Sequence, residues 1–178
     1  MMNGEGLRVV LWLSGCSHKC RGCQNPQTWD TNSGILFDKA AKEELFRELD
    51  KDYISGLTLS GGDPLFENNL NDVLDLVNEI RLSSSHKSIW LYTGYKFEDI
   101  FKCYRNGEYV GFPHYDKSYP DKNAIKRQDI IRKCDVLVDG QYIESKRDIT
   151  RKWCGSSNQN VIDIQKTLEK GKVILWDV

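Results

Sequence analysis

Short apolar runs that each end at a glycine are the feature that most limits the fold of this chain. Four such runs, rich in Val, Ile, Leu and aromatic residues, are separated by segments in which apolar residues have helical spacing. Apolar runs of this length are typical of buried strands, and strands that alternate with helices indicate βαβ units. The sequence therefore predicts an α/β protein with an open, mostly parallel sheet. The predicted strands are 8–14, 56–60, 88–93 and 135–139, followed by a final strand at 172–176.

The spacing of apolar residues between these runs predicts the helices. Asp38 is placed to cap a helix over about 39–51, and the clearest helical pattern covers about 69–82. Shorter helices are predicted over 97–104, near 124–133 and over 161–170, the last of them capped by Asn158.

The length of 178 residues favours a single domain over 1–178. There are too few strand–helix units for a closed eight-stranded barrel, which takes about 250 residues. An open sheet or a partial (β/α) barrel is therefore expected. The segment 103–133 interrupts the alternation with tyrosines, prolines and mixed charge, and is predicted to be an excursion from this domain.

The charge balance excludes several classes of partner. Lys and Arg total 25 and Asp and Glu total 26, which gives a net charge of −1 and no reason to expect binding to nucleic acid or to an anionic membrane. No apolar run approaches the roughly 20 residues that span a bilayer. The first residues lack the pattern of a secretory signal, so a cytoplasmic location is expected.

Three of the six cysteines lie close together, directly after the first predicted strand. Cys16, Cys20 and Cys23 form a C-x3-C-x2-C pattern in a loop with two glycines, so their sulfurs can converge. In a reducing compartment, thiolates at this density indicate metal ligation or redox chemistry rather than disulfides, and they suit zinc or an iron–sulfur cluster. The remaining cysteines are scattered and predicted to be free thiols: Cys103, Cys134 and Cys154.

The number of ligands bears on which metal this loop would hold. Structural zinc uses four protein ligands, whereas three cysteines lie in this loop. His18 could be a fourth, although its position between Cys16 and Cys20 makes a tetrahedron difficult to close. Three thiolates on a four-iron cluster would leave one iron without a protein ligand, where a substrate or cofactor could bind. Three cysteines that merely pack together are the remaining alternative.

A second motif follows the second predicted strand. Ser60 is followed by Gly61, Gly62, Asp63 and Pro64. Two glycines at the carboxyl end of a strand let a ligand approach the bare backbone, whose carbonyls can accept hydrogen bonds from an ammonium group. An ordinary turn is the alternative for such a segment taken alone.

Together the two motifs resemble those of the radical S-adenosylmethionine enzymes. The resemblance implies that Cys16, Cys20 and Cys23 hold a [4Fe–4S] cluster whose fourth iron is chelated by S-adenosylmethionine. Reductive cleavage of that cofactor would then give a 5′-deoxyadenosyl radical, with no acid–base residue needed. It also implies a partial barrel and a set of residues that bind or lie against the cofactor: Gly22, Cys23, Gln24, Gly61, Gly62, Asp63 and Thr93.

Further segments resemble one family of these enzymes, the activating proteins of anaerobic ribonucleoside-triphosphate reductases. They are 3–8, 14–16, 23–29, 93–95, 136–140 and 155–159. One departure is Gln24, where the family often has tyrosine. The resemblance implies a glycyl radical made on the large subunit of that reductase, with an electron donor such as flavodoxin. Two alternatives stay open: activation of another glycyl-radical enzyme such as pyruvate formate-lyase, and a non-catalytic metal-binding or redox-sensing module.

Overall fold

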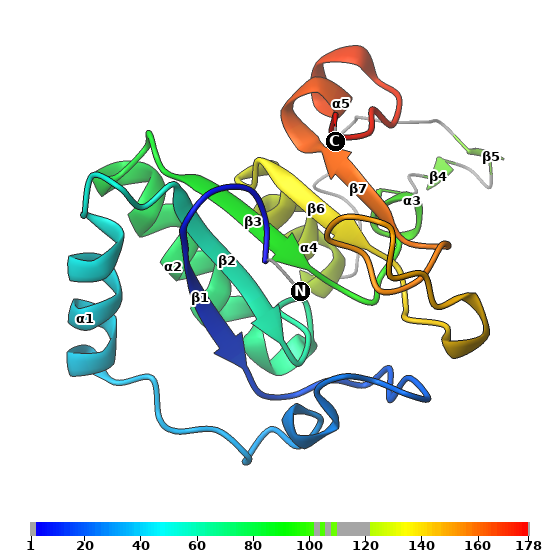
Figure 1. Cartoon of the computed structure of the whole chain (residues 1–178). Coiled ribbons are helices and arrows are strands. Elements are labelled where there is room, and N and C mark those ends of the chain that lie inside the picture. Colours follow the sequence, from blue (N-terminus) through cyan, green and yellow to red (C-terminus); the bar gives the residue numbers. More distant parts are fainter. Residues whose placement is uncertain (1–2, 102–103, 106–107, 110–121, 178) are drawn as a thin grey trace.

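The protein is an α/β fold built on one open sheet. A computed structural model describes residues 3–101, 104–105, 108–109 and 122–177 (Figure 1). The sheet has five strands in the order β1-β2-β3-β6-β7. The first four run parallel, and β7 lies antiparallel to β6. Their bounds are Arg8–Leu13 for β1, Gly56–Gly61 for β2, Ser88–Tyr92 for β3, Val136–Asp139 for β6 and Asn160–Asp163 for β7.

Helices connect these strands. They are α1 (Lys39–Leu49), α2 (Leu70–Ser83), α3 (Phe97–Ile100), α4 (Lys122–Arg132) and α5 (Ile164–Lys170). Short 3-10 turns lie at Pro26–Thr28, Glu67–Asn69 and Glu144–Lys146, and a two-stranded antiparallel ribbon joins β4 (Tyr104–Arg105) to β5 (Glu108–Tyr109).

The helix signals in the sequence operate as expected in the first half of the chain. The Asp38 carboxylate accepts a hydrogen bond of 2.9 Å from the Ala41 N–H, which caps α1. In α2, residues three and four apart are buried on one face: Leu70, Val73, Leu76, Val77 and Ile80. The open, mostly parallel sheet and the helices near 39–51, 69–82 and 124–133 are thus confirmed.

The predictions for the C-terminal part are partly wrong. Residues 160–163 form strand β7 rather than the start of a helix, and α5 begins only at Ile164. Val161 and Ile162 pack in different hydrophobic clusters, as successive residues do only in an extended chain. Asp163, not Asn158, caps α5. The 172–176 segment forms no strand, because only the Ile162–Leu175 bridge joins it to the sheet.

The segment after β3 also differs from expectation. Helix α3 ends at Ile100 instead of continuing to residue 104, and Tyr104–Arg105 is strand β4. Nearly half of the predicted 103–133 excursion, at 103, 106–107 and 110–121, lies outside the described residues.

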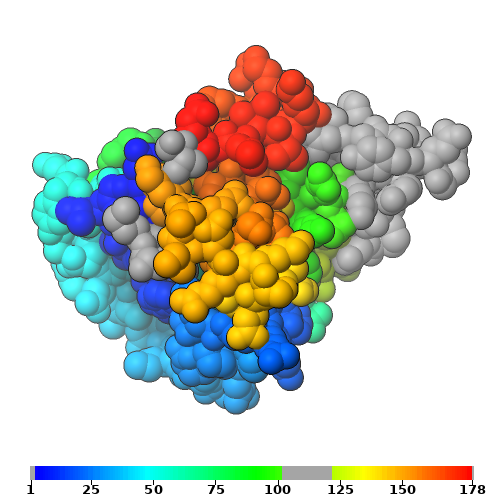
Figure 2. Space-filling view, turned by 45° about the vertical axis from the view of Figure 1, so that its right-hand side comes forward, coloured from blue at the N-terminus to red at the C-terminus, as the bar shows by residue number. Residues whose placement is uncertain are grey.

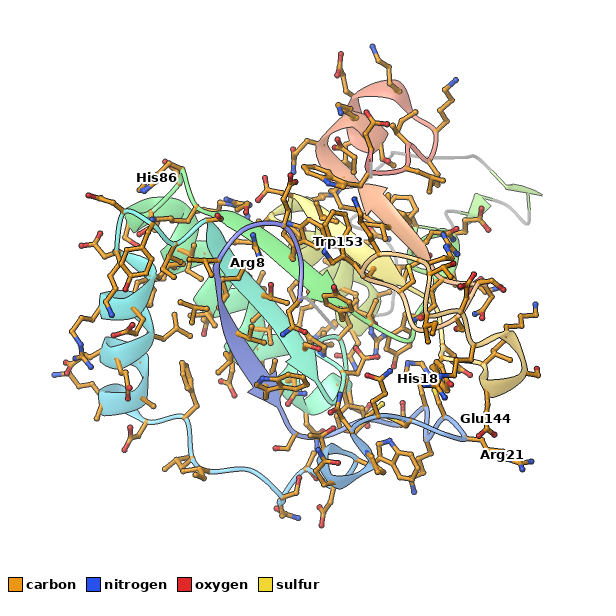
Figure 3. The ribbon with its side chains drawn as sticks, in the orientation of Figure 1. Arg8, His18, Arg21, His86, Glu144 and Trp153 are labelled. Carbon is orange, nitrogen blue, oxygen red and sulfur yellow. The ribbon has the colours of Figure 1, made fainter. Side chains whose placement is uncertain are left out.

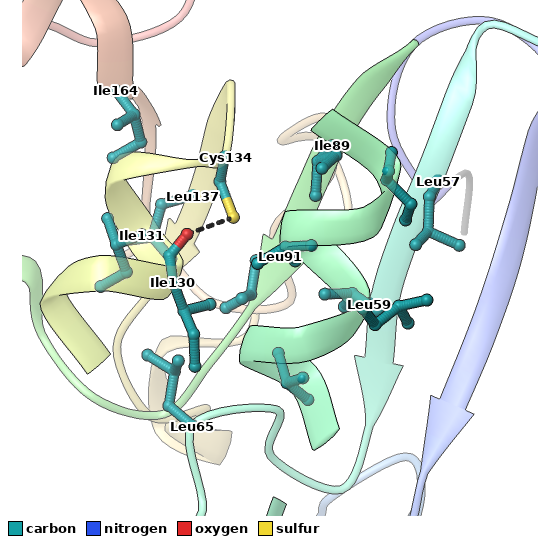
Figure 4. Close-up of a cluster of buried hydrophobic side chains, with 14 of the residues drawn as sticks. Leu57, Leu59, Leu65, Ile89, Leu91, Ile130, Ile131, Cys134, Leu137 and Ile164 are labelled. Atoms are coloured by element: carbon teal, nitrogen blue, oxygen red, sulfur yellow. Dashed lines mark hydrogen bonds between the residues drawn. The ribbon is translucent and has the colours of Figure 1, made fainter. Parts of the chain in front are cut away.

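The main core lies between the sheet and the helices. Leucine and isoleucine side chains of β2, β3 and β6 meet those of α2 and α4 there (Figure 4). The other face of the sheet carries a smaller cluster around Trp90 and Trp153, whose rings meet edge to face at 4.8 Å. Because each parallel strand ends at the same edge, the loops after β1, β2, β3 and β6 come together there. No helix among the described residues has the length and apolar character that crossing a bilayer requires.

Arg8 ties the first three strands together. Its guanidinium donates hydrogen bonds of 2.7 to 2.8 Å to the Thr58 hydroxyl and the Leu57 carbonyl in β2, and to the Ser88 hydroxyl and carbonyl in β3. It also lies 5.4 Å from the centre of the Trp90 ring. Burial lowers the pKa of Arg8 to about 10, so the side chain remains charged at neutral pH.

Replacing Arg8 by alanine should therefore lower the free energy of unfolding by about 3 kcal/mol, because several buried acceptors lose a charged donor. Urea unfolding of the apo protein measures this loss. Arg47→Ala, at an exposed position of α1, is the matched control and should change stability by less than about 0.5 kcal/mol. Equal losses in the two variants would contradict this account of Arg8.

Candidate functional site

The cysteine loop, residues 15–29, leaves the carboxyl end of β1 and is closed by backbone hydrogen bonds. The Gly15 N–H donates to the Thr28 carbonyl at 2.8 Å, and the Cys16 N–H donates to the Trp29 carbonyl at 3.1 Å. A further bond of 3.1 Å joins the Cys23 N–H to the Cys20 carbonyl. These bonds make the loop a closed unit at the edge of the sheet, with its three cysteines half-buried.

The three cysteines line one cavity of about 120 Å³ together with the glycine turn after β2. The residues predicted from the sequence that share its wall are Cys16, Cys20, Cys23, Gly61, Gly62, Asp63 and Thr93. Gly22 and Gln24 are exposed and do not line it. Among the described residues, no three His, Cys, Asp or Glu side chains are grouped closely enough to hold a single metal ion.

Asp63 organises the turn after β2 although its side chain is only 1% exposed. Its carboxylate accepts hydrogen bonds from the Thr93 hydroxyl at 2.8 Å, the Gly94 N–H at 3.0 Å and the Leu65 N–H at 2.8 Å. His18 Nε2 lies 3.0 Å from Asp63 Oδ2. The predicted site residues Asp63 and Thr93 are thus bonded to each other, and the carboxylate joins the ends of β2 and β3 to the cysteine loop.

The two glycines of this turn are required by neighbouring backbone. Gly61 has a φ of +100°, and a Cβ there would lie 2.7 Å from the Leu13 carbonyl oxygen. A Cβ on Gly62 would lie 2.5 Å from the Gly15 carbonyl oxygen. Both glycines are thus required by the end of β1 and by the cysteine loop, whereas the approach of a ligand to this turn stays a prediction.

The segment after β6 lies against the cysteine loop, and most of this contact is not predicted from the sequence. Arg21 Nε and Glu144 Oε2 lie 3.0 Å apart, both at the surface (Figure 3). In Figure 2 the gold surface of this segment adjoins the blue surface of the cysteine loop. Tyr142 and Gln159 line the cavity from this side. The sequence signal for Tyr142 is its place after a parallel strand, and the signal for Gln159 is the 155–159 segment of the family resemblance.

Polar groups around the cavity suit an iron–sulfur cluster. Burial raises the pKa of the Cys16 and Cys20 thiols, so binding a metal there releases protons. Three thiols on one cavity wall are the donor set that iron–sulfur clusters use. Tyr92 lines the same cavity, and its buried hydroxyl has no hydrogen-bond partner among the described residues. The three thiols therefore fit an iron–sulfur cluster. One iron of a four-iron cluster would be left for a ligand that is not a cysteine of this loop.

The cysteines outside the loop are placed differently. Cys103 lies outside the described residues, and Cys154 is buried in the cluster around Trp90. Cys134 is fully buried in the main core, and its thiol lies 3.3 Å from the Ile130 carbonyl oxygen (Figure 4). Burial raises the pKa of Cys134 to about 12.

Cys134 should consequently resist alkylation in the native apo protein. At pH 8 a thiol with that pKa is about one part in ten thousand thiolate, the reactive form. Iodoacetamide followed by mass spectrometry should show Cys134 labelled at least about 100-fold more slowly than Cys23, which is partly exposed. Labelling in denaturant is the control and should remove the difference. Rapid native labelling of Cys134 would show that the core opens around it.

Known proteins resemble this chain along nearly its whole length. The family described as "4Fe-4S single cluster domain" matches residues 2–162. The anaerobic ribonucleoside-triphosphate reductase-activating protein of Enterobacteria phage T4 is 39% identical over 160 residues, which cover 90% of this chain and 86% of that protein. The protein of the same name from Escherichia coli K12 is 37% identical over 163 residues, covering 90% and 91%. The chain belongs to the family of anaerobic ribonucleoside-triphosphate reductase-activating proteins.

Membership of the anaerobic reductase-activating family rests on more than these two relatives. The Haemophilus influenzae protein of the same name is 35% identical over 161 residues, covering 89% of each chain. No solved structure matches the chain at a significant level. The family resemblance read from the sequence motifs is confirmed, as is the expected 4Fe-4S character of the domain.

Proposed function

We propose that this chain activates an anaerobic ribonucleoside-triphosphate reductase by radical S-adenosylmethionine chemistry. It would bind one [4Fe–4S] cluster and S-adenosylmethionine, cleave the cofactor reductively, and generate a glycyl radical on the large subunit of the reductase. The names and the extent of the matching relatives support the reductase as partner.

One observation carries the proposal. Three cysteines and the glycine turn, which come from separate parts of the sequence, line the same cavity at the carboxyl ends of the parallel strands. Ligand sites in open parallel sheets lie at this edge. A site for metal alone needs only the cysteines, whereas a site for metal and cofactor also needs the bare backbone beside them.

Each residue of the site has a defined task in this proposal. Cys16, Cys20 and Cys23 would hold the cluster through their thiolates. When bound, the reduced cluster would supply the electron that cleaves the sulfonium and yields a 5′-deoxyadenosyl radical.

The remaining residues would bind the cofactor. The Gly61 and Gly62 backbone would receive its amino group, and Asp63 and Thr93 would keep that turn in place. Gly22 and Gln24, which lie outside the cavity, would lie against the cofactor only where it extends out of the cavity toward the exposed side of the loop.

The proposal extends to the setting of the protein. We infer a single domain over 1–178 with the partial-barrel geometry of radical S-adenosylmethionine enzymes, acting in the cytoplasm. An electron donor such as flavodoxin would reduce the cluster. The cysteines among the described residues are free thiols, which supports a reducing compartment.

Anaerobic reconstitution with iron and sulfide, followed by reduction with S-adenosylmethionine present, tests the proposal. We expect about four irons per chain, as a [4Fe–4S] cluster requires, together with formation of 5′-deoxyadenosine. Adding the reductase should give a glycyl radical signal in electron paramagnetic resonance.

Other results would favour the alternatives. A radical formed only on pyruvate formate-lyase would assign a different partner. Bound zinc, or a cluster that never cleaves the cofactor, would instead indicate a structural or sensing role.

A further inference from the structure

His18 is turned inward between two exposed residues of the cysteine loop. Its neighbours Ser17 and Lys19 are exposed, whereas the His18 side chain is only 10% exposed. Lys19 has a φ of +46°, in the left-handed region that non-glycine residues seldom occupy. Such a backbone conformation is unfavourable and persists only where surrounding contacts hold it. His18 directly precedes Lys19, so its contacts can hold this part of the loop in place.

The imidazole contacts the ends of three parallel strands. Nε2 lies 3.0 Å from Asp63 Oδ2 after β2, in a polar contact that is not aligned as a hydrogen bond. Nδ1 lies 2.9 Å from Gln141 Nε2 after β6, and the ring meets that of Tyr95 after β3 edge to face at 4.7 Å. An amide nitrogen only donates, so Nδ1 accepts a hydrogen bond from the Gln141 side chain.

Gly94 provides the space for this ring. A Cβ on Gly94 would lie 2.3 Å from His18 Cδ2 and 2.7 Å from Nε2. The φ of Gly94 is not in the left-handed region, so the ring, rather than the backbone conformation, is what demands glycine here. Gly94 also donates its N–H to Asp63, and the slot for the imidazole is thus part of the same network.

We propose that His18 is a positioning residue: by occupying this slot it fixes the cysteine loop against the ends of β2, β3 and β6, and so sets how tightly S-adenosylmethionine binds beside the cysteines. The loop and the Asp63 turn come from different strands, and the imidazole lies between them. The part of this inference that concerns the cofactor rests on the proposed function. The part that concerns the loop does not, because it can be measured on apo protein.

Amide hydrogen exchange of the apo protein is the first test. The Gly15, Cys16 and Cys23 amides are hydrogen-bonded within the loop and report its opening. In His18→Ala their exchange should be about tenfold faster, as expected for loss of a polar contact. His18→Gln, which can still donate toward Asp63 and accept from Gln141, should restore most of the protection. His86→Ala, at an exposed histidine far from the loop (Figure 3), is the control.

Gly94→Ala tests the same slot by filling the space that the imidazole occupies. Its methyl group should expel the imidazole and speed loop exchange about as much as His18→Ala does. Because both changes break one interaction, the double variant should exchange no faster than either single variant. Additive effects of the two changes would contradict the claim that His18 holds the loop through this slot. Loop amides that exchange at the wild-type rate in His18→Ala would contradict it as well.

The loaded protein tests the positioning role. After reconstitution, the dissociation constant for S-adenosylmethionine, measured from the change in the resonance signal of the reduced cluster, should rise about tenfold in His18→Ala. The rate of 5′-deoxyadenosine formation at saturation should change less than twofold, and His18→Gln should restore the affinity. An unchanged dissociation constant with a loosened loop would overturn the positioning role. Failure of wild-type protein to bind the cofactor would instead refute the proposed function, while the exchange data would still show whether His18 holds the loop.

Discussion

Cys20→Ala should abolish cofactor cleavage. Cys20 lines the cavity together with the other two thiols of the loop, and removing it would leave two protein ligands for a four-iron cluster. Loss of a residue that merely supports a metal ligand costs about 10- to 100-fold, so loss of a ligand should lower 5′-deoxyadenosine formation by at least about 100-fold. Iron content and the cluster signal of the reduced protein should fall with it.

Cys154→Ala is the matched control for this change. Cys154 is also a buried thiol, but it packs on the Trp90 side of the sheet and does not line the cavity. This variant should keep its full iron complement and its cleavage rate. A Cys20→Ala protein that made 5′-deoxyadenosine at the wild-type rate would remove the cysteine loop from the proposed chemistry.

Asp63→Ala should destabilise the apo protein by about 3 kcal/mol, before any cofactor is involved. The change leaves the Thr93 hydroxyl and the Leu65 and Gly94 N–H groups without their acceptor in a buried place. Buried donors that lose a partner cost about 1–3 kcal/mol each when they cannot reach water. Urea unfolding measures the loss, and 5′-deoxyadenosine formation by the loaded variant should fall at least about tenfold.

An exposed carboxylate provides the comparison for Asp63. Asp52→Ala, in the turn before β2, should change the free energy of unfolding by less than about 0.5 kcal/mol. Wild-type stability in Asp63→Ala would mean that the three donors find other acceptors, and would remove the carboxylate from its place as the connection between β2 and β3.

The sequence predicts the elements whose signals are local. Strands β1, β2, β3 and β6 are apolar runs, and α1 and α2 carry a cap or a clear apolar face. Strand β7 has only four residues, and its apolar pair Val161–Ile162 fits helical spacing as well as an extended chain. Only its pairing with β6 decides between the two, and that pairing depends on contacts far along the chain.

The residues of the site likewise divide into those with a local sequence signal and those placed by long-range contacts. Spacing alone indicates the three cysteines and the double glycine, because each motif lies within a few residues. The contact between His18 and Asp63 depends on the register that places Leu13 beside Gly61, which no local pattern encodes. The contribution of Tyr142 and Glu144 depends in addition on how the long segment after β6 folds back. Local motifs therefore indicate the candidate ligands but not the scaffold around them.

The separation between His18 and Gln141, 123 positions along the chain, has a consequence for biosynthesis. The cysteines leave the ribosome well before Gln141, because more than a hundred residues are translated between them. Contacts between such distant segments form late, after the entropy of closing the intervening chain has been overcome. Insertion of a cluster into the finished loop would accordingly have to wait until the segment around Gln141 has been made and has folded back onto the cysteines.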